Sequence, residues 1–97
     1  MYVTTLDEAR EYEVKRRGVK GVRVKYLLHA GVGAERIQLR VFTIAPGGHT
    51  QMERHGHEHE VFLLEGKALF KVGGSLVQAS PGYAIFIASN EPHQIIN

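Results

Sequence analysis

Cysteine is absent from this chain of 97 residues, and its absence removes several classes of protein at once. A scaffold held by disulfides, a zinc site made of thiolates and a cysteine nucleophile are all excluded. No apolar run approaches the roughly 20 residues that a membrane-spanning helix needs. The first residues, MYVTTLDEAR, lack the basic head and apolar stretch of a secretory signal. We therefore expect a cytoplasmic protein that has no membrane partner.

An excess of one charge is also missing. Twelve Lys and Arg residues stand against ten Asp and Glu, which gives a formal net charge of +2. The basic segment 15–25 holds six of the twelve bases and no acid. Two of them, Arg23 and Lys25, occupy the polar positions of an alternating run, and only Tyr26 offers an adjacent aromatic ring for stacking on a base. We interpret the segment as a solvated face and expect no nucleic-acid partner.

Short alternating runs separated by glycine make up most of what is present. Hydrophobic residues at 43% and charged residues at 23% are ordinary for one folded domain. The eleven glycines follow no G-x-y period, so they indicate turns rather than collagen. The expected strands cover residues 22–28, 37–43, 59–64, 68–72, 76–79, 83–88 and 93–96. Many short strands with a turn every 8–12 residues or so predict an all-β sandwich or barrel.

Local signals divide these runs. In the second run, apolar Ile37, Leu39 and Val41 alternate with polar side chains that include Arg40. The sequence Ala45-Pro46-Gly47-Gly48 is expected to end that strand, and Gly73-Gly74 predicts a two-residue hairpin turn.

The N-terminal segment is less regular than the rest. Residues 6–17 have a thin amphipathic pattern, which leaves both a helix and an irregular arm open. We assign residues 1–97 to one domain, in which residues 1–20 form an N-terminal arm or an edge strand.

The densest chemistry lies between residues 53 and 60, where three histidines and three carboxylates occur together. In an extended backbone, alternate side chains point to the same side, and this parity is shared by Glu53, His55, His57 and His59. Imidazoles and a carboxylate converging on one side are a ligand set for a divalent transition metal. The alternative is a solvated polar loop without a metal.

A remote histidine strengthens the metal interpretation. His93 follows the apolar run 83–88, and a closed sheet could bring it beside the first cluster. The remaining candidates, His29 and His49, lie in turn regions and are predicted to be surface side chains.

Two spacings in this region resemble those of the cupins, whose motifs are written G-x5-H-x-H-x3-E-x6-G and G-x5-P-x-G-x2-H-x3-N. The first spacing is met in full by Gly47, Glu53, His55, His59 and Gly66. Glu53 stands where the motif has its first histidine, and His59 stands where it has glutamate. The second spacing is met by Gly82, Ala88, Asn90, His93 and Asn97, with Ala88 replacing proline and Asn90 replacing glycine. The resemblance covers about half of the chain.

The resemblance implies a double-stranded β-helix, or jelly-roll barrel, with a metal ion inside one end. Its ligand positions correspond here to Glu53, His55, His59 and His93, with His57 as the alternative fourth ligand. The implied cofactor is one divalent transition metal ion: Fe, Mn, Ni, Cu or Zn. About two open positions on an octahedral ion would leave room for water, dioxygen or substrate.

Two functions are compatible with such a site. The first is an enzyme acting on a small organic molecule, with dioxygenase chemistry favoured by analogy. The alternative is a non-catalytic cupin module that binds or senses a small ligand. Apolar candidates for the pocket wall or the core are Phe42, Phe62, Phe70, Tyr83 and Phe86.

The chain ends at Asn97, where many cupins continue for another strand or two. A barrel with fewer strands must close on itself or take an edge from a partner, since an unpaired edge invites association. We therefore expect a homodimer that uses the N-terminal strands.

Overall fold

The computed structural model describes residues 1–97 and contains eight β-strands and one turn of 3-10 helix. The elements are β1 (Glu11–Glu13), β2 (Lys20–Leu28), η1 (Ala30–Val32), β3 (Leu39–His49), β4 (His59–Phe62), β5 (Ala68–Val72), β6 (Ser75–Ala79), β7 (Ala84–Ile87) and β8 (His93–Ile96). The all-β prediction is confirmed. The structure has no helix with the length and apolar character needed to span a membrane.

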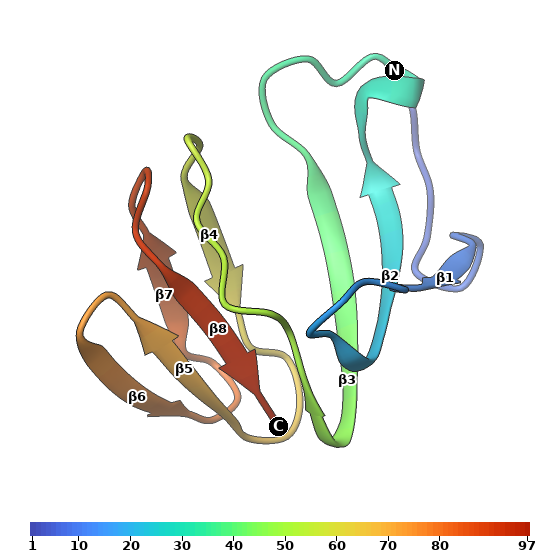
Figure 1. The fold of residues 1–97 in the computed structure, drawn as a ribbon. Coiled ribbons are helices and arrows are strands. Elements are labelled where there is room, and N and C mark those ends of the chain that lie inside the picture. Colours follow the sequence, from blue (N-terminus) through green and yellow to red (C-terminus); the bar gives the residue numbers. More distant parts are fainter.

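The strands form two antiparallel sheets of the jelly-roll type. One sheet has the order β1-β2-β3-β8-β5-β6, and the other consists of β4 and β7. The β2–β3 pair stands beside the group β4–β8, and β3 meets that group where His49 pairs with Ile96 (Figure 1). The two sheets therefore enclose a barrel whose walls come from distant parts of the sequence.

Strand β3 is longer than the sequence predicts. It runs through Pro46, Gly47 and Gly48 instead of ending before them. The β2–β3 ladder is irregular here, because Val22 pairs with Ile44 while Lys20 pairs with His49. The extra β3 residues form a bulge, in which Gly47 has a φ of 78°. The proline and glycines therefore bend this strand without ending it.

A two-residue turn joins β5 to β6, as predicted. Val72 pairs with Ser75 across Gly73 and Gly74, and Gly73 has a φ of 58°. The hairpin carries the main core cluster of Ala68, Phe70 and Ala79, against which side chains of β4, β7 and β8 pack.

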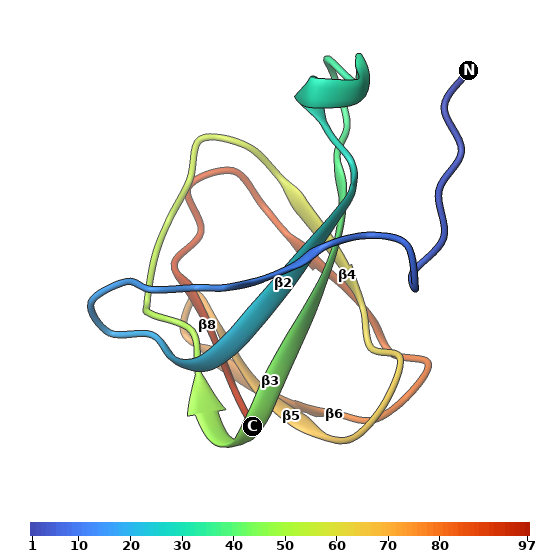
Figure 2. The same ribbon diagram turned by 90° about the vertical axis from the view of Figure 1, so that its right-hand side faces the viewer.

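The N-terminal segment contains no helix. After a turn, β1 pairs with β2 at the edge of the large sheet. Lys25 Nζ donates a hydrogen bond of 2.7 Å to the Leu6 carbonyl, and Arg23 lies 3.4 Å from the Glu11 carboxylate. These two basic side chains fasten the arm to β2. The first residues extend away from the sheets (Figure 2).

Few side chains are fully enclosed in this barrel. Only 8 of 97 residues are buried, and Phe70 is the one buried aromatic side chain. The other aromatic side chains that we considered for the wall or the core are all at least 45% exposed: Phe42, Phe62, Tyr83 and Phe86. A core-filling role is therefore wrong for these four. Much of the apolar surface remains uncovered in the single chain.

Candidate metal centre

Three histidines from distant positions converge at one end of the barrel. The nitrogens of His55, His59 and His93 that could bind an ion all lie within 4.8 Å of one another. Their ring centroids are 5.2 to 5.4 Å apart. Rings bound to one ion through nitrogens at about 2.1 Å would have centroids roughly 4.5 to 5.2 Å apart. The three imidazoles could therefore hold a single metal ion.

The cluster depends on a bent loop. His59 begins β4 and pairs with Ile87, whereas Glu53 forms an isolated bridge with His93. The chain between them bends at residues 56 and 57, so our expectation of one extended segment is wrong.

Hydrogen bonds tie this loop to the β7–β8 turn. Asn90 N donates to the His55 carbonyl at 2.6 Å, and Ser89 Oγ donates to the Gly56 carbonyl at 2.7 Å. The convergence of the histidines therefore comes from a loop held by the second motif, rather than from strand alternation.

His93 is prepared to bind through one nitrogen. It is 6% exposed, and its Nδ1 lies 2.9 Å from the Glu91 carbonyl oxygen. A carbonyl can only accept, so Nδ1 carries the hydrogen, and in the neutral ring the lone pair is on Nε2. Orienting hydrogen bonds of this kind are usual behind histidines that bind metals.

His59 offers the most direct support for a metal ion at this position. Its Nε2 atom is buried and has no hydrogen-bond partner, which is costly unless something occupies the position. Burial, together with the smaller effect of positive charge on the neighbouring histidines and on Arg40, lowers the pKa of His59 from 6.5 to about 4. The ring is therefore neutral at physiological pH, which is the form that binds a metal.

Glu53 is the carboxylate that contacts the cluster. Its Oε1 lies 3.3 Å from His55 Nε2 and 3.9 Å from His93 Nε2, while Oε2 accepts a hydrogen bond from Gln51 at 3.0 Å. Burial raises the pKa of Glu53, but the hydrogen bond from Gln51 and the charge of the two histidines outweigh it, so the pKa is lowered overall. Glu53 is therefore ionised and faces two of the three imidazoles that could hold an ion.

His57 is at the margin of the cluster. Its exposed ring stacks on that of His55, with centroids 5.0 Å apart and an interplanar angle of 11°. It also meets His59 edge to face at 4.7 Å. Its nitrogens are not among those that lie within 4.8 Å of one another.

The other two histidines are outside the cluster. His29 Nδ1 accepts a hydrogen bond from Gly31 N at the start of η1, and His49 Nδ1 lies 3.1 Å from the Thr50 carbonyl. Both side chains are half-buried.

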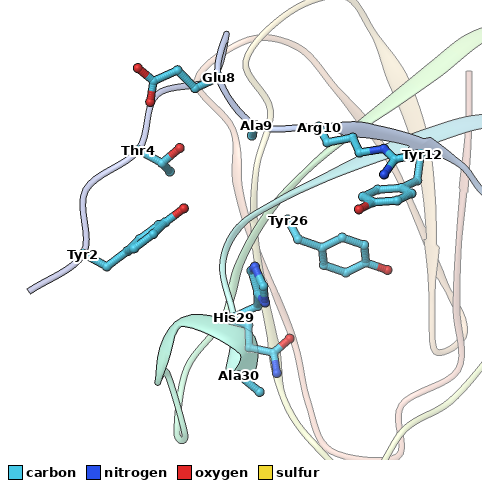
Figure 3. Close-up of a pocket in the computed structure, with 10 residues that line it drawn as sticks. Tyr2, Thr4, Glu8, Ala9, Arg10, Tyr12, Tyr26, His29 and Ala30 are labelled. Atoms are coloured by element: carbon cyan, nitrogen blue, oxygen red, sulfur yellow. The ribbon is translucent and has the colours of Figure 1, made fainter.

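A separate hollow lies between the N-terminal arm and β2, with a volume of about 510 Å³. Figure 3 shows the rings of Tyr12 and Tyr26 on one side of it and Tyr2, Thr4 and Glu8 on the other. It contains none of the clustered histidines.

The sheets and the histidine cluster define a cupin, and sequence comparison agrees. The family model described as the cupin domain matches residues 40–97. The chain therefore belongs to the cupin family.

Solved structures of other proteins have the same fold. The polyketide cyclase RemF from Streptomyces resistomycificus is 30% identical, with a TM-score of 0.92 over 100% of this chain and 70% of its own. A predicted oxalate decarboxylase from Thermotoga maritima is 27% identical, with a TM-score of 0.86 over 99% of this chain and 87% of its own.

A curated relative is similar over a shorter region. The 1-methylthio-D-xylulose 5-phosphate methylsulfurylase of Rhodospirillum rubrum is 37% identical over 57 residues. The match covers 59% of this chain but only 36% of the relative.

Proposed function

We propose that this cupin is a metal-dependent enzyme that acts on a small organic molecule. The observation that carries the proposal is the convergence of three imidazoles around the buried, unpartnered Nε2 of His59. The proposed ligands are Glu53, His55, His59 and His93. Glu53 is preferred to His57 because its Oε1 already approaches two of the three imidazoles, whereas the His57 ring is exposed.

The chain's own residues would hold and orient the ion. Neutral imidazoles and one carboxylate, without thiolate, suit Fe, Mn, Ni, Cu or Zn. Such an ion supplies Lewis-acid or redox chemistry at the positions that the protein leaves open. The Glu91 carbonyl fixes the tautomer of His93, and the bonds from Asn90 and Ser89 hold the loop that carries His55.

Dioxygenase chemistry is the first reaction class to test, because this ligand set suits redox-active ions such as iron. The relatives bear the names of a polyketide cyclase, a predicted oxalate decarboxylase and a methylsulfurylase, which supports a small organic substrate. Oxygen uptake by the iron-loaded protein with candidate substrates would support the oxygenase. Turnover without oxygen uptake would favour the other chemistries.

One observation favours the alternative, a non-catalytic module that binds or senses a small ligand. Glu53 is the only carboxylate in contact with the cluster, so no second acid stands there to move protons if Glu53 binds the ion. Tight ligand binding without turnover, by metal-loaded protein, would support this function.

Elemental analysis of the untagged protein tests the metal site. We expect about one transition metal ion per chain, and near-background metal in His55→Ala, His59→Ala and His93→Ala. The matched controls are His29→Ala and His49→Ala, whose side chains are outside the cluster. Full metal content in all three cluster variants would overturn the proposal.

The proposed partners are a small-molecule substrate and a second copy of the chain. We propose a homodimer in which the exposed apolar surface is covered. A cytoplasmic location and the lack of nucleic-acid and membrane partners stay predictions from the sequence.

A further inference from the structure

An arginine lies on the inner face of β3, where the sequence pattern did not lead us to expect one. Val22 and Val24 are 2% and 3% exposed, so they identify the face of β2 that points into the barrel. Val24 pairs with Phe42 and Tyr26 pairs with Arg40. Because directly opposed residues in a sheet share a face, Arg40 and Phe42 point the same way as the buried valines.

The Arg40 guanidinium has no partner for its charge. The side chain is half-buried, and its Cζ lies 5.2 Å from the centroid of the Phe42 ring. The ion pairs of the structure are those of Glu11 with Arg23 and of Glu53 with His55 and His93. Arg40 also makes no side-chain hydrogen bond to another residue, so all five of its N–H donors are available.

The free charge acts on the histidine cluster. Besides burial and the neighbouring histidines, the positive charge of Arg40 contributes to lowering the pKa of His59. The strand geometry places Arg40 and the cluster on the same interior. His59 shares its face of β4 with Val61, and His93 shares its face of β8 with Ile95. Val61 and Ile95 both pack against the core cluster. Arg40 and the histidines therefore all face the inside of the barrel, where one small molecule could contact both.

Glu53 is the one carboxylate of the cluster. The positive charge of a bound ion and of Arg40 would exceed its single negative charge, so the site favours an anionic ligand.

The surroundings of Arg40 also fit a ligand with an apolar body. Phe42 is 45% exposed, and its ring lies beside the Arg40 guanidinium. This exposed aromatic ring offers a contact surface next to the guanidinium, whose planar fork matches a carboxylate.

We propose that Arg40 binds the anionic oxygen group of the substrate, with Phe42 packing against the substrate's carbon skeleton. The substrate class is then a small organic anion such as a carboxylate. This inference rests on the proposed function, because the bound anion is a substrate only if the protein is an enzyme. The binding of an anion can be measured without turnover.

Benzoate and benzamide make a suitable pair of probes, because they have nearly the same shape and differ in charge. Titration calorimetry or NMR would measure the binding of each to wild-type protein, Arg40→Gln, Arg40→Lys and the control Arg36→Gln, an exposed arginine. We expect Arg40→Gln to weaken benzoate binding at least about tenfold, as expected for the loss of a charge-assisted hydrogen bond.

The other variants give a defined pattern. Arg40→Lys should retain part of the affinity, since it keeps the charge and loses the fork. Arg36→Gln should bind like the wild type, and benzamide should bind weakly to every variant. Equal affinity of wild type and Arg40→Gln for benzoate, or no benzoate binding to the wild type, would overturn the inference.

Metal content separates this failure from that of the proposed function. Arg40→Gln should keep the wild-type metal content, because Arg40 is no proposed ligand. A wild-type protein that takes up no metal but binds benzoate through Arg40 would remove the enzyme proposal and leave the anion site. A protein that binds metal normally, but binds benzoate independently of Arg40, would remove the anion site and leave the enzyme proposal.

Discussion

Glu53 and His57 compete for the role of fourth ligand, and their surroundings differ. The Glu53 carboxylate is oriented by Gln51 and approaches His55 and His93, whereas His57 is exposed and contacts its neighbours by ring stacking. We expect Glu53→Ala to weaken metal binding by about 10- to 100-fold, and His57→Ala to change it by less than about threefold. Metal titration with a competing chelator measures both affinities. The opposite ranking would make His57 the ligand.

Acid should destabilise the metal-free protein. Burial and the neighbouring positive charges lower the pKa of His59 from 6.5 to about 4, so between these values the unfolded chain binds a proton that the folded chain does not. The free energy of unfolding therefore falls as the pH falls through this window. The lowered pKa of Glu53 adds a further loss in more acidic solution.

Urea unfolding with a chelator present, from pH 7 to pH 5, measures this dependence. The slope should be smaller in His59→Asn, which cannot take up the proton. Stability that rises toward pH 5 in the wild type would contradict the assignment of a neutral, buried His59.

At the scale of the element, β3 shows how a strand accommodates a bulge. A Cβ added to Gly48 would lie 2.6 Å from the Lys20 carbonyl oxygen and 2.9 Å from that of Ala45. Both obstacles are backbone, so neither can move aside cheaply. We expect Gly48→Ala to lower the free energy of unfolding by about 1–3 kcal/mol.

Gly74→Ala is the matched control, since a Cβ there meets nothing within 4 Å. Chemical denaturation of both variants measures the difference. Equal stability of the two would mean that the β2–β3 bulge relaxes freely.

The same strand shows where prediction from the sequence ends. Alternation placed most strands within a residue or two, since period and glycine turns are local signals. The alternation indicated the wrong inward-pointing face for β3, where apolar Leu39 is 51% exposed and Arg40 shares a face with Phe42. The register with β2 decides which face is inside, and that register is a long-range property.

The candidate site was predictable in its residues and less so in its geometry. Spacing identified His55, His59 and His93, because each histidine stands at a motif position. The bend at residues 56 and 57 and its hydrogen bonds to Ser89 and Asn90 depend on tertiary contacts. Arg40 was missed for the same reason.

At the scale of the whole molecule, the single chain exposes 7175 Å². A compact monomer of 10.8 kDa exposes about 5,500 Å², so the excess is roughly 1,600 Å². Permanent homodimers bury about 1,000–2,500 Å² on each chain. The excess falls within this range, as expected if the proposed homodimer covers it.

Light scattering coupled to size exclusion, at micromolar concentration, should give the mass of two chains. Replacing exposed apolar residues of the N-terminal arm, Val3→Asp together with Leu6→Asp, should shift the mass toward one chain. Leu76→Asp, at an exposed position on β6, is the control. A wild-type monomer would contradict the homodimer.

The pairings of the C-terminal half are nested inside one another, and this order bears on the kinetics of folding. Val72 pairs with Ser75, Phe62 with Ala84, His59 with Ile87, Glu53 with His93 and His49 with Ile96. Local pairings close smaller loops and form first. The histidines lie on the outer pairs, so the site would be assembled after the transition state for folding. A bound ion should then slow unfolding and leave the refolding rate nearly unchanged, and stopped-flow measurements with and without metal would reveal it.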